Sequence, residues 1–331
     1  MIITRTPYRI SFLGGGTDHP LWYEKNGGAV LSASIDKYCY ISCRFLPPFF
    51  KHKHRIVYSK IENVNNIDEI DHPSVKESMR LTGIDKGLEI HHDGDLPAMS
   101  GLGSSSSFTV GLLHALYGLD GKIITKRQLA LDAIHVEQNM IKENVGSQDQ
   151  TIAAFGGFNK IEFGGNQKIT VNPITISTER LRDFQNHLLL FFTDFSRKAS
   201  DIEAEKLKNF KNKNKELHMM AAMVEEGVNI LKSNENLNNF GKLLDESWKL
   251  KRSLSPVVST SKIDAIYDAG LKAGAVGGKL LGAGGGGFML FFAPPERHKK
   301  IKEKLNKFLN VPFCIDYSGS QIIYYAPQVL G

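Results

Sequence analysis

The chain has 331 residues, of which 41% are apolar and 23% are charged, so it is long enough for one large domain or two ordinary ones and too apolar for wholesale disorder. The 41 Lys and Arg residues exceed the 35 Asp and Glu residues, which gives a formal net charge of +6. These charges are dispersed along the sequence, whereas a nucleic-acid binder gathers its basic residues on one face. We therefore expect no nucleic-acid partner, and an anionic small substrate fits the balance.

The sequence shows none of the signals of a membrane or secreted protein. Its longest apolar run is far shorter than the ~20 residues of a membrane span. The N-terminus lacks the basic start and apolar stretch of a signal peptide. Cys39, Cys43 and Cys314 are too few for a disulfide framework and do not match zinc-ligand spacing. We expect a cytoplasmic protein without a membrane partner, and leave open whether it forms a homo-oligomer.

The N-terminal half alternates short strands with helices. Apolar alternation and β-branched residues predict strands at residues 2–13, 29–35, 38–45, 88–93, 158–163 and 167–174. An apolar run predicts a helix over residues 104–117. Two capping boxes, Thr125 with Gln128 and Ser147 with Gln150, predict further helices that end near residues 142 and 155. A basic loop is expected at residues 46–55.

The C-terminal half is richer in helices. Their predicted ranges are 200–232, 237–251, 262–272 and 295–309. Strands are expected at residues 187–193, 287–292 and 321–326, and near Lys279. The basic run at 206–218 indicates a solvated helix face. This order of strands and helices predicts an α+β chain with two domains, residues 1–180 and residues 181–331.

Glycine concentrates in three segments, residues 14–18, 101–107 and 282–287. The spacing of Gly282, Gly284 and Gly287 matches the letters of a dinucleotide-binding fingerprint, but a strand follows where a helix is required. Lys279 is followed by leucine, so this segment is not a Walker A loop either.

The central segment, GLGSSSS, is typical of a phosphate site. Gly101 and Gly103 let the backbone approach a ligand closely, and four serines then open a helix. The free N–H groups of a first helical turn and the helix dipole attract anions. A plain helix cap needs one serine rather than four, so phosphate binding is the better interpretation.

Three charged residues supply the remaining requirements of phosphoryl transfer, which are a metal carboxylate, a base and a cation. Glu137, taken alone, has the pattern of a surface glutamate. Asp149 lies in a first helical turn, where it either stabilises the helix start or acts as a base. Arg9 stands beside the first glycine turn and is the candidate cation.

Together these residues resemble the GHMP family of small-molecule kinases. Residues 5–18, 97–108 and 279–288 match the three family motifs in order. The resemblance implies an α+β, two-lobed GHMP kinase fold, with an N-terminal lobe like ribosomal protein S5 and a ferredoxin-like C-terminal lobe. It places the active site between the lobes and implies ATP and Mg²⁺ as cofactors.

The family pattern also implies individual roles. Asp149 matches the base, and Arg9 matches the arginine near the transferred phosphoryl group. Ser105 and Glu137 match the Mg²⁺ ligands. The implied nucleotide-binding residues are Gly101, Leu102, Gly103, Ser104, Ser105, Ser106, Gly284 and Gly285. The implied substrate residues are Gly15, Gly16, Thr17, Asp18 and Arg197.

One departure from the family bears on the substrate. Galactokinases carry Glu-His before the Thr-Asp pair, and here Gly15 and Gly16 take those places. A carboxylate would repel a phosphorylated sugar, whereas glycine amides would accept one. Basic residues that could bind the sugar's own phosphate are Arg197, Lys198, Lys251 and Arg252, although an ordinary surface charge is the better interpretation of any single one.

Four segments of the sequence are most similar to the D-glycero-D-manno-heptose 7-phosphate kinases, namely residues 14–20, 194–200, 247–255 and 277–288. That similarity implies phosphorylation of the anomeric C1 hydroxyl of a small-molecule sugar phosphate, giving the 1,7-bisphosphate for nucleotide-activated heptose and surface polysaccharide synthesis. Two alternatives stay open. One is another anomeric sugar kinase, acting on fucose or an N-acetylhexosamine, and the other is a non-catalytic sensor of sugar and ATP with the same fold.

Overall fold

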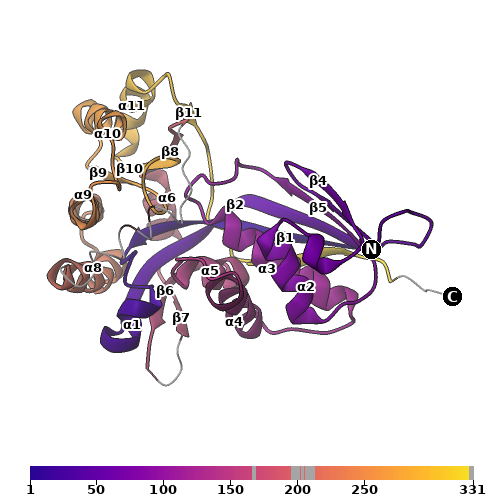
Figure 1. The fold of residues 1–331 in the computed structure, drawn as a ribbon. Helices are drawn as coiled ribbons and strands as arrows, with labels where there is room; N and C mark the ends of the chain where they lie inside the picture. Colours follow the sequence, from indigo (N-terminus) through magenta and orange to yellow (C-terminus); the bar gives the residue numbers. More distant parts are fainter. Residues whose placement is uncertain (166–168, 195–201, 203–204, 206–212, 328–331) are drawn as a thin grey trace.

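The computed structural model describes residues 1–165, 169–194, 202, 205 and 213–327. In this part of the chain the strands form two sheets, one of eight strands and one of four. Figure 1 shows helices α2 to α5 gathered on one face of the larger sheet, while α9, α10 and α11 surround the smaller sheet. The α+β, two-lobed fold implied by the sequence is confirmed.

The larger sheet has the strand order β12-β1-β2-β5-β3-β4, and β6 pairs with β2 and with β7. Its strands are β1 (Ile2–Leu13), β2 (Gly28–Phe45), β3 (His54–Val57), β4 (Ile61–Val64), β5 (Leu88–Gly94), β6 (Phe158–Phe163), β7 (Ile169–Pro173) and β12 (Gln321–Tyr325). The smaller sheet has the order β11-β8-β10-β9. Its strands are β8 (Leu188–Phe192), β9 (Gly277–Leu280), β10 (Phe288–Phe292) and β11 (Leu309–Asn310).

The helices of the larger lobe are α1 (Pro20–Asn26), α2 (Pro73–Thr82), α3 (Ser104–Leu119), α4 (Lys126–His135) and α5 (Gln148–Phe155). Those that follow are α6 (Thr178–Asn186), α8 (Asn214–Lys232), α9 (Asn238–Leu254), α10 (Ser261–Ala273) and α11 (His298–Lys304). Short 3₁₀ turns occur at Ile67–Glu69 and Pro295–Arg297. Across the described ranges, no helix combines the length and the apolar character that crossing a bilayer requires.

The strand pair expected at residues 29–35 and 38–45 is instead one strand of 18 residues, β2. The polar residues Asp36 and Lys37 read as a turn in the sequence. In the structure the antiparallel register of β1 with β2 shifts between Pro7 and Tyr8, opposite these residues. A bulge of this kind absorbs extra residues and bends the strand without ending it.

The last strand returns to the first lobe. β12 pairs antiparallel with β1, so that Ile2 lies opposite Tyr325. The expected boundary near residue 180 falls inside α6, and β12 belongs to the sheet of the N-terminal lobe although it follows the C-terminal lobe in sequence.

Helix ends differ from the expected ones where side chains have other partners. The Thr125 hydroxyl caps α4 by accepting the N–H of Gln128, as expected. The capping box expected at Ser147 is wrong, because Ser147 makes no side-chain cap and Gln150 donates to Glu137 instead. The helix expected at 295–309 shortens to α11, and the first part of the helix expected at 200–232 lies largely outside the described residues.

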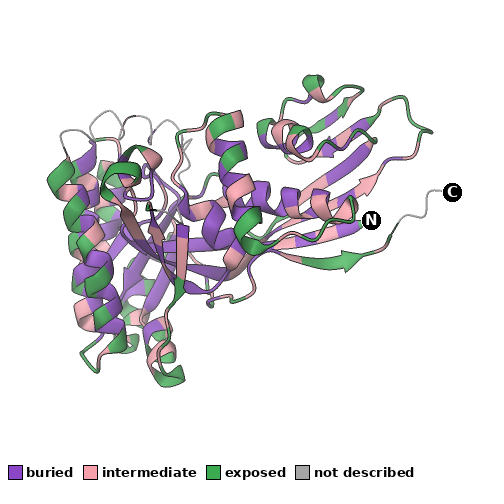
Figure 2. Ribbon diagram, turned by 90° about the horizontal axis from the view of Figure 1, so that it is seen from below, coloured by how far each residue is buried: buried purple, intermediate pink, exposed green. Residues whose placement is uncertain are grey.

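An aromatic cluster joins the two lobes into one hydrophobic core. Phe12 of β1 packs against Phe184 of α6 and Phe240 of α9, with ring centroids 5.4 and 6.0 Å apart. Phe240 in turn lies 5.6 Å from Phe292 of β10. Edge-to-face rings of this kind add to the burial of apolar area. Figure 2 shows the sheets mostly buried and the outer sides of the helices exposed.

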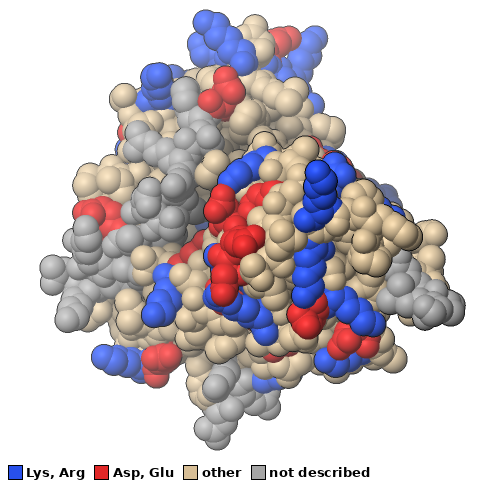
Figure 3. All heavy atoms as spheres, turned by 45° about the vertical axis from the view of Figure 1, so that its right-hand side comes forward, with Lys and Arg blue, Asp and Glu red and all other residues tan. Residues whose placement is uncertain are grey.

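The surface mixes both signs of charge. On the face drawn in Figure 3, acidic and basic side chains lie next to one another. Described surface ion pairs include Lys60 with Asp71 and Arg80 with Asp68. Water screens such exposed pairs, so each adds little to the stability of the fold.

Candidate active site

A cavity of about 400 Å³ lies where the motifs of the two lobes meet. Its walls come from β1 and the following glycine turn, the central glycine–serine loop, the start of α5, and the segment after β9. The lining includes Arg9, Ser11, Gly15, Gly16, Asp18, Gly101, Gly103, Ser104, Ser105, Ser106, Glu143, Gln148, Asp149, Lys251, Lys279, Gly282 and Ala283. Segments from both ends of the sequence therefore build one site.

The central loop presents the start of α3 to the cavity. Gly101 and Gly103 have φ angles of +83° and +75°, in the left-handed region that favours glycine. Gly103 is the N-cap of α3, and its carbonyl accepts the N–H of Ser107. The unpaired N–H groups of this first turn and the helix dipole suit phosphate oxygens. Leu102, between the two glycines, is fully buried in the core, so its backbone rather than its side chain shapes the loop.

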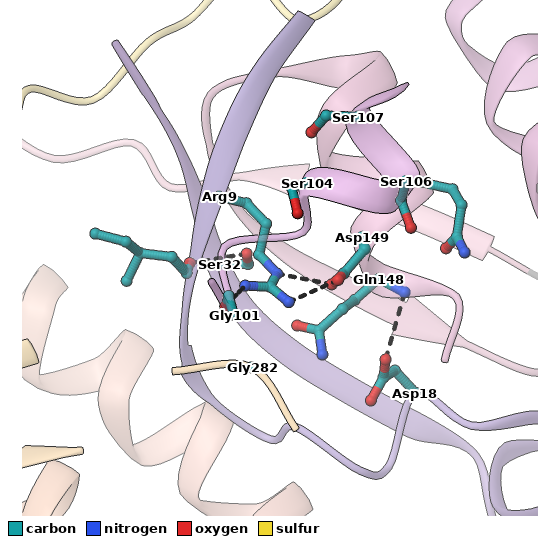
Figure 4. Close-up of polar contacts among 12 residues, drawn as sticks. Arg9, Asp18, Ser32, Gly101, Ser104, Ser106, Ser107, Gln148, Asp149 and Gly282 are labelled. Carbon is teal, nitrogen blue, oxygen red and sulfur yellow. Dashed lines mark hydrogen bonds and ion pairs between the residues drawn. The ribbon is translucent and has the colours of Figure 1, made fainter. Parts of the chain in front are cut away.

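Arg9 and Asp149 form a two-point ion pair at the mouth of this loop (Figure 4). Arg9 Nε donates to Asp149 Oδ1 at 2.7 Å, and Nη2 donates to Oδ2 at 2.6 Å. Arg9 Nη1 donates to the Gly101 carbonyl at 2.6 Å. A Cβ on Gly103 would lie 3.2 Å from Asp149 Oδ2. The guanidinium thus fixes the carboxylate beside the N-terminus of α3 with the geometric specificity of a fork–fork pair.

Glu137 is fully buried, so the surface position that its sequence pattern indicates is wrong. It lies in a π-helical turn, Val136–Met140, an arrangement common at functional sites. Its Oε2 accepts from the Ser106 hydroxyl at 2.9 Å and from Gln150 Nε2. Its Oε1 has no hydrogen-bond partner among the described residues. Burial raises the pKa of Glu137 to about 7, and the nearby Glu143 carboxylate also raises it.

These groups fit a Mg²⁺ ion. Magnesium is bound through one or two carboxylates together with substrate phosphates, and Glu137 offers a buried oxygen with no described partner. Ser106 connects Glu137 to the cavity, and Glu143 lines it directly. Ser105, the serine expected as a metal ligand, is exposed at the cavity, while the hydroxyl that bonds Glu137 is that of Ser106.

The first glycine turn is held by Asp18. The Asp18 carboxylate accepts the N–H of Gly16 at 2.8 Å and the N–H of Gln148 at 3.4 Å. Asp18 therefore connects this turn to the start of α5, and both Gly15 and Gly16 line the cavity. Thr17 is fully buried, and its hydroxyl donates to the carbonyls of Gly14 and Ala29. Its side chain shapes the turn from beneath.

The glycines of the C-terminal loop serve close backbone packing. A Cβ on Gly282 would lie 2.4 Å from Gly101 Cα, so the two glycine loops touch directly. Gly284 and Gly285, expected at the nucleotide, pack against Val258, whose carbonyl accepts the N–H of Gly285 at 3.0 Å. The cavity is lined instead by Gly282 and Ala283.

The basic residues considered for the substrate phosphate differ in position. Lys251 is only 5% exposed, lines the cavity and donates to the carbonyls of Leu280 and Gly282. Arg252 instead pairs with Asp264 at 2.9 Å and is partly exposed. Arg197 and Lys198 lie outside the described residues.

Several lining or supporting residues, Glu143 among them, were missed in the sequence. Lys279 lines the cavity and donates to the Phe12 carbonyl at 2.7 Å. Ser11 and Gln148 also line it. A Cβ on Gly146 would lie 1.9 Å from Asp18 Oδ2, so glycine is required there. Ser11 lies inside the first motif segment, residues 5–18, and Gln148 directly precedes Asp149, and these positions are the sequence signals that point to them.

Comparison with known proteins agrees with this architecture. Residues 73–157 match the model of the GHMP kinases N terminal domain, and residues 219–311 match that of the GHMP kinases C terminal domain. The chain is 31% identical to the D-glycero-alpha-D-manno-heptose 7-phosphate kinase of Campylobacter jejuni, over 92% of this chain and 93% of that protein. It is 25% identical to the galactokinase of Thermotoga maritima, over 94% and 95% of the two chains.

Solved structures share the fold. A crystal structure of a D-glycero-D-manno-heptose 1-phosphate kinase from Bacteroides thetaiotaomicron matches with a TM-score of 0.80 at 22% identity, over 98% of this chain and all of that one. The phosphomevalonate kinase of Streptococcus pneumoniae matches with a TM-score of 0.76 at 15% identity, over 98% and 100% of the two chains. The chain belongs to the GHMP kinase family, whose members transfer phosphoryl groups from ATP, and it is a sugar kinase.

Proposed function

We propose that this enzyme transfers the γ-phosphoryl group of ATP to the anomeric C1 hydroxyl of D-glycero-D-manno-heptose 7-phosphate. The product is the 1,7-bisphosphate, which serves the synthesis of nucleotide-activated heptose for surface polysaccharides. The observation that carries the chemistry is the Asp149 carboxylate, fixed by Arg9 at the N-terminus of α3. The acceptor is supported by the 31% identity to a heptose 7-phosphate kinase along nearly the whole of both chains.

In the proposed reaction Asp149 accepts the proton of the C1 hydroxyl as its oxygen attacks the γ-phosphorus. The bond from the γ-phosphorus to the β–γ bridging oxygen breaks, and ADP leaves. Arg9 lies against Asp149 and neutralises charge that builds on the transferred group. Gly101, Gly103 and the first turn of α3 hold the nucleotide phosphates through backbone N–H groups.

Mg²⁺ would neutralise the phosphate oxygens and orient the nucleotide. Glu137 is the proposed carboxylate ligand, and either Ser105 or Ser106 supplies a hydroxyl, because both line the cavity. The buried Glu137 Oε1, which has no described hydrogen-bond partner, is the observation in favour of this role.

The acceptor would lie against the first glycine turn. Gly15 and Asp18 line the cavity near the start of α5, and Lys251 brings a buried positive charge from the other lobe. A doubly charged sugar phosphate suits that charge. Arg197 remains a proposed ligand of the sugar's phosphate from a segment outside the described residues.

An acceptor panel read out as ADP release tests this function. We expect turnover with D-glycero-D-manno-heptose 7-phosphate and little with the same heptose lacking its phosphate. Turnover with fucose or an N-acetylhexosamine, and none with the heptose phosphate, would show that the proposed acceptor is wrong. The proposed phosphoryl transfer to an anomeric hydroxyl would stand. Binding of ATP and sugar without ADP release would identify a sensor and overturn the proposed reaction.

A further inference from the structure

The Gln148 side chain lies in the active-site cavity with an unused hydrogen-bond acceptor. It is 9% exposed, and its Oε1 atom is buried with no hydrogen-bond partner among the described residues. In Figure 4 its carboxamide extends below the Arg9–Asp149 pair toward Gly282, away from Asp18. A buried amide oxygen without a partner destabilises the fold, so its position beside the reacting centre requires an explanation.

The fold does not need this carboxamide. Gln148 is the first residue of α5, and its backbone N–H makes the connection to Asp18. The N-cap of the helix is Ser147. The contact that stabilises the fold at this position is thus made by the backbone N–H, which any residue other than proline supplies.

A second polar group with an unused hydrogen-bonding capacity lies close by. The hydroxyl of Ser11 is buried and has no described partner, and Ser11 lines the same cavity. Gly15 separates the two groups. A Cβ placed on Gly15 would lie 3.5 Å from Ser11 Oγ and 3.8 Å from Gln148 Nε2. The missing side chain at position 15 therefore leaves space that both polar groups border.

The geometry points to a polar subsite, formed by Gln148, Ser11 and the space at Gly15, that recognises the sugar hydroxyl next to the one that is phosphorylated. The Gln148 carboxamide lies below the Arg9–Asp149 pair in the same cavity (Figure 4), so an acceptor whose reacting hydroxyl meets Asp149 brings its neighbouring hydroxyl to the carboxamide. A hydroxyl can donate to Gln148 Oε1 and accept from Ser11 or from Gln148 Nε2. The acceptor class is thus a sugar with adjacent hydroxyl groups at the reacting end.

This inference rests on the proposed function, because it uses Asp149 as the base. It adds a basis for selectivity, since a site with a buried polar group strongly rejects an analogue that leaves the group unpaired. It also gives Gly15 a different role, because the absent side chain leaves room for the sugar and the residue does not bind the phosphate.

A cycle that removes each partner in turn tests the subsite. The substrates are D-glycero-D-manno-heptose 7-phosphate and its 2-deoxy analogue, and the enzymes are wild type and Gln148→Met. For wild type we expect the 2-deoxy analogue to lose about 10- to 100-fold in kcat/KM. For Gln148→Met we expect the same deoxygenation to cost less than about threefold, because the partner is already gone. An undiminished penalty in Gln148→Met would overturn the subsite.

Gly15→Ala provides a second variant that does not depend on Gln148. Its Cβ would make only ordinary contacts, so the variant should fold, while the added methyl group narrows the subsite. We expect the sugar KM to rise about tenfold and the Mg-ATP dissociation constant to stay unchanged. An unchanged sugar KM would count against the subsite.

Gln128→Met is the matched control, because Gln128 is exposed on α4 and bonds only to Thr125 and Asp132 among the contacts described. It should behave as wild type with both sugars. If wild type itself releases no ADP with the heptose phosphate, the proposed acceptor is wrong. The cycle then uses the accepted sugar of the panel and its deoxy analogue, so the two failures are distinguishable.

Discussion

The two walls of the cavity are built on different principles. The wall from the N-terminal lobe presents side chains whose atoms are fixed by directional bonds, such as the Arg9–Asp149 pair. The wall from the C-terminal lobe brings the Lys251 and Lys279 side chains, but it meets the other lobe as backbone packed against backbone, where Gly282 contacts Gly101 and Gly287 contacts Ser100. A reaction needs a base held in one orientation. Joining two lobes around a ligand needs a close approach that only glycine permits.

This difference predicts how substitutions in each wall should affect the protein. Removing a functional atom from the first wall should leave the packing of the fold intact and change catalysis or ligand binding instead. Adding one carbon to the second wall should damage packing first. The experiments below test this contrast, beginning with the largest expected effect.

Asp149→Asn removes the proposed base while keeping the size of the side chain. We expect turnover to fall about 10²- to 10⁴-fold, the range that a positioned general base contributes. Calorimetry should find Mg-ATP affinity close to that of wild type. The exposed surface change Asp120→Asn is the control and should leave turnover unchanged. Full activity of Asp149→Asn would remove this residue from the mechanism.

Gly282→Ala places a methyl group against Gly101 Cα at a φ of +69°. We expect a loss of about 2–5 kcal/mol in the free energy of unfolding, from backbone strain together with overpacking. Gly83→Ala is a matched control, because Gly83 has the same φ and no atom within 4 Å of its added Cβ. Urea denaturation of both variants separates close approach from strain. Equal losses would show that the two loops do not need to touch.

Glu137→Gln tests how burial of the Glu137 carboxyl affects the stability of the fold. The pKa of Glu137 is raised from 4.5 to about 7, so between these values the folded state binds more protons than the unfolded state. Stability from this group therefore falls as pH rises from about 4.5 to 7. We expect Glu137→Gln to be more stable than wild type at pH 8 in EDTA, by about 3 kcal/mol at most.

The measurement is denaturation of both proteins from pH 5 to pH 8, without divalent ions. Burial also raises the pKa of Glu143, but this carboxyl is present in both proteins and its effect cancels in the difference. Parallel stability curves would contradict the assignment. Added Mg-ATP should stabilise wild type more than the variant.

Lys251→Met and Arg252→Met compare two adjacent basic residues of α9, one buried and one partly exposed. Lys251 lines the cavity, whereas Arg252 pairs with Asp264 at the surface. We expect the KM of the phosphorylated sugar to rise about tenfold in Lys251→Met, since bonds to charged groups are stronger than neutral ones. Arg252→Met should change stability by less than about 1 kcal/mol and leave KM unchanged. An unchanged sugar KM in Lys251→Met would place Lys251 outside substrate binding.

Local patterns predicted those parts of the fold that depend on neighbouring residues. The strand at residues 2–13, the apolar run of α3 and the Thr125 cap all reappear in the structure. The bulge in β2 was not predictable, because it depends on the register of β1 across the sheet. Helices α1, α2 and α6 were also not anticipated, and they are short, at seven, ten and nine residues.

The site residues likewise divide into those that the sequence predicts and those that it does not. The glycine–serine loop could be found because its residues are consecutive, and its position at the cavity follows from the helix that it begins. The burial of Glu137 could not be found, since it results from the packing of a π-helical turn beneath α3. Lys279 escaped notice because its neighbour in space, Phe12, is far away in sequence.

The position of β12 has a consequence for how the two lobes can be made and separated. Its antiparallel pairing with β1 means that the first sheet cannot be completed until the second lobe has been synthesised. A fragment cut at the apparent midpoint of the chain would expose the backbone donors and acceptors of β1 along that edge, a template for aggregation. Recombinant halves of this kinase should therefore become soluble only when they are produced together.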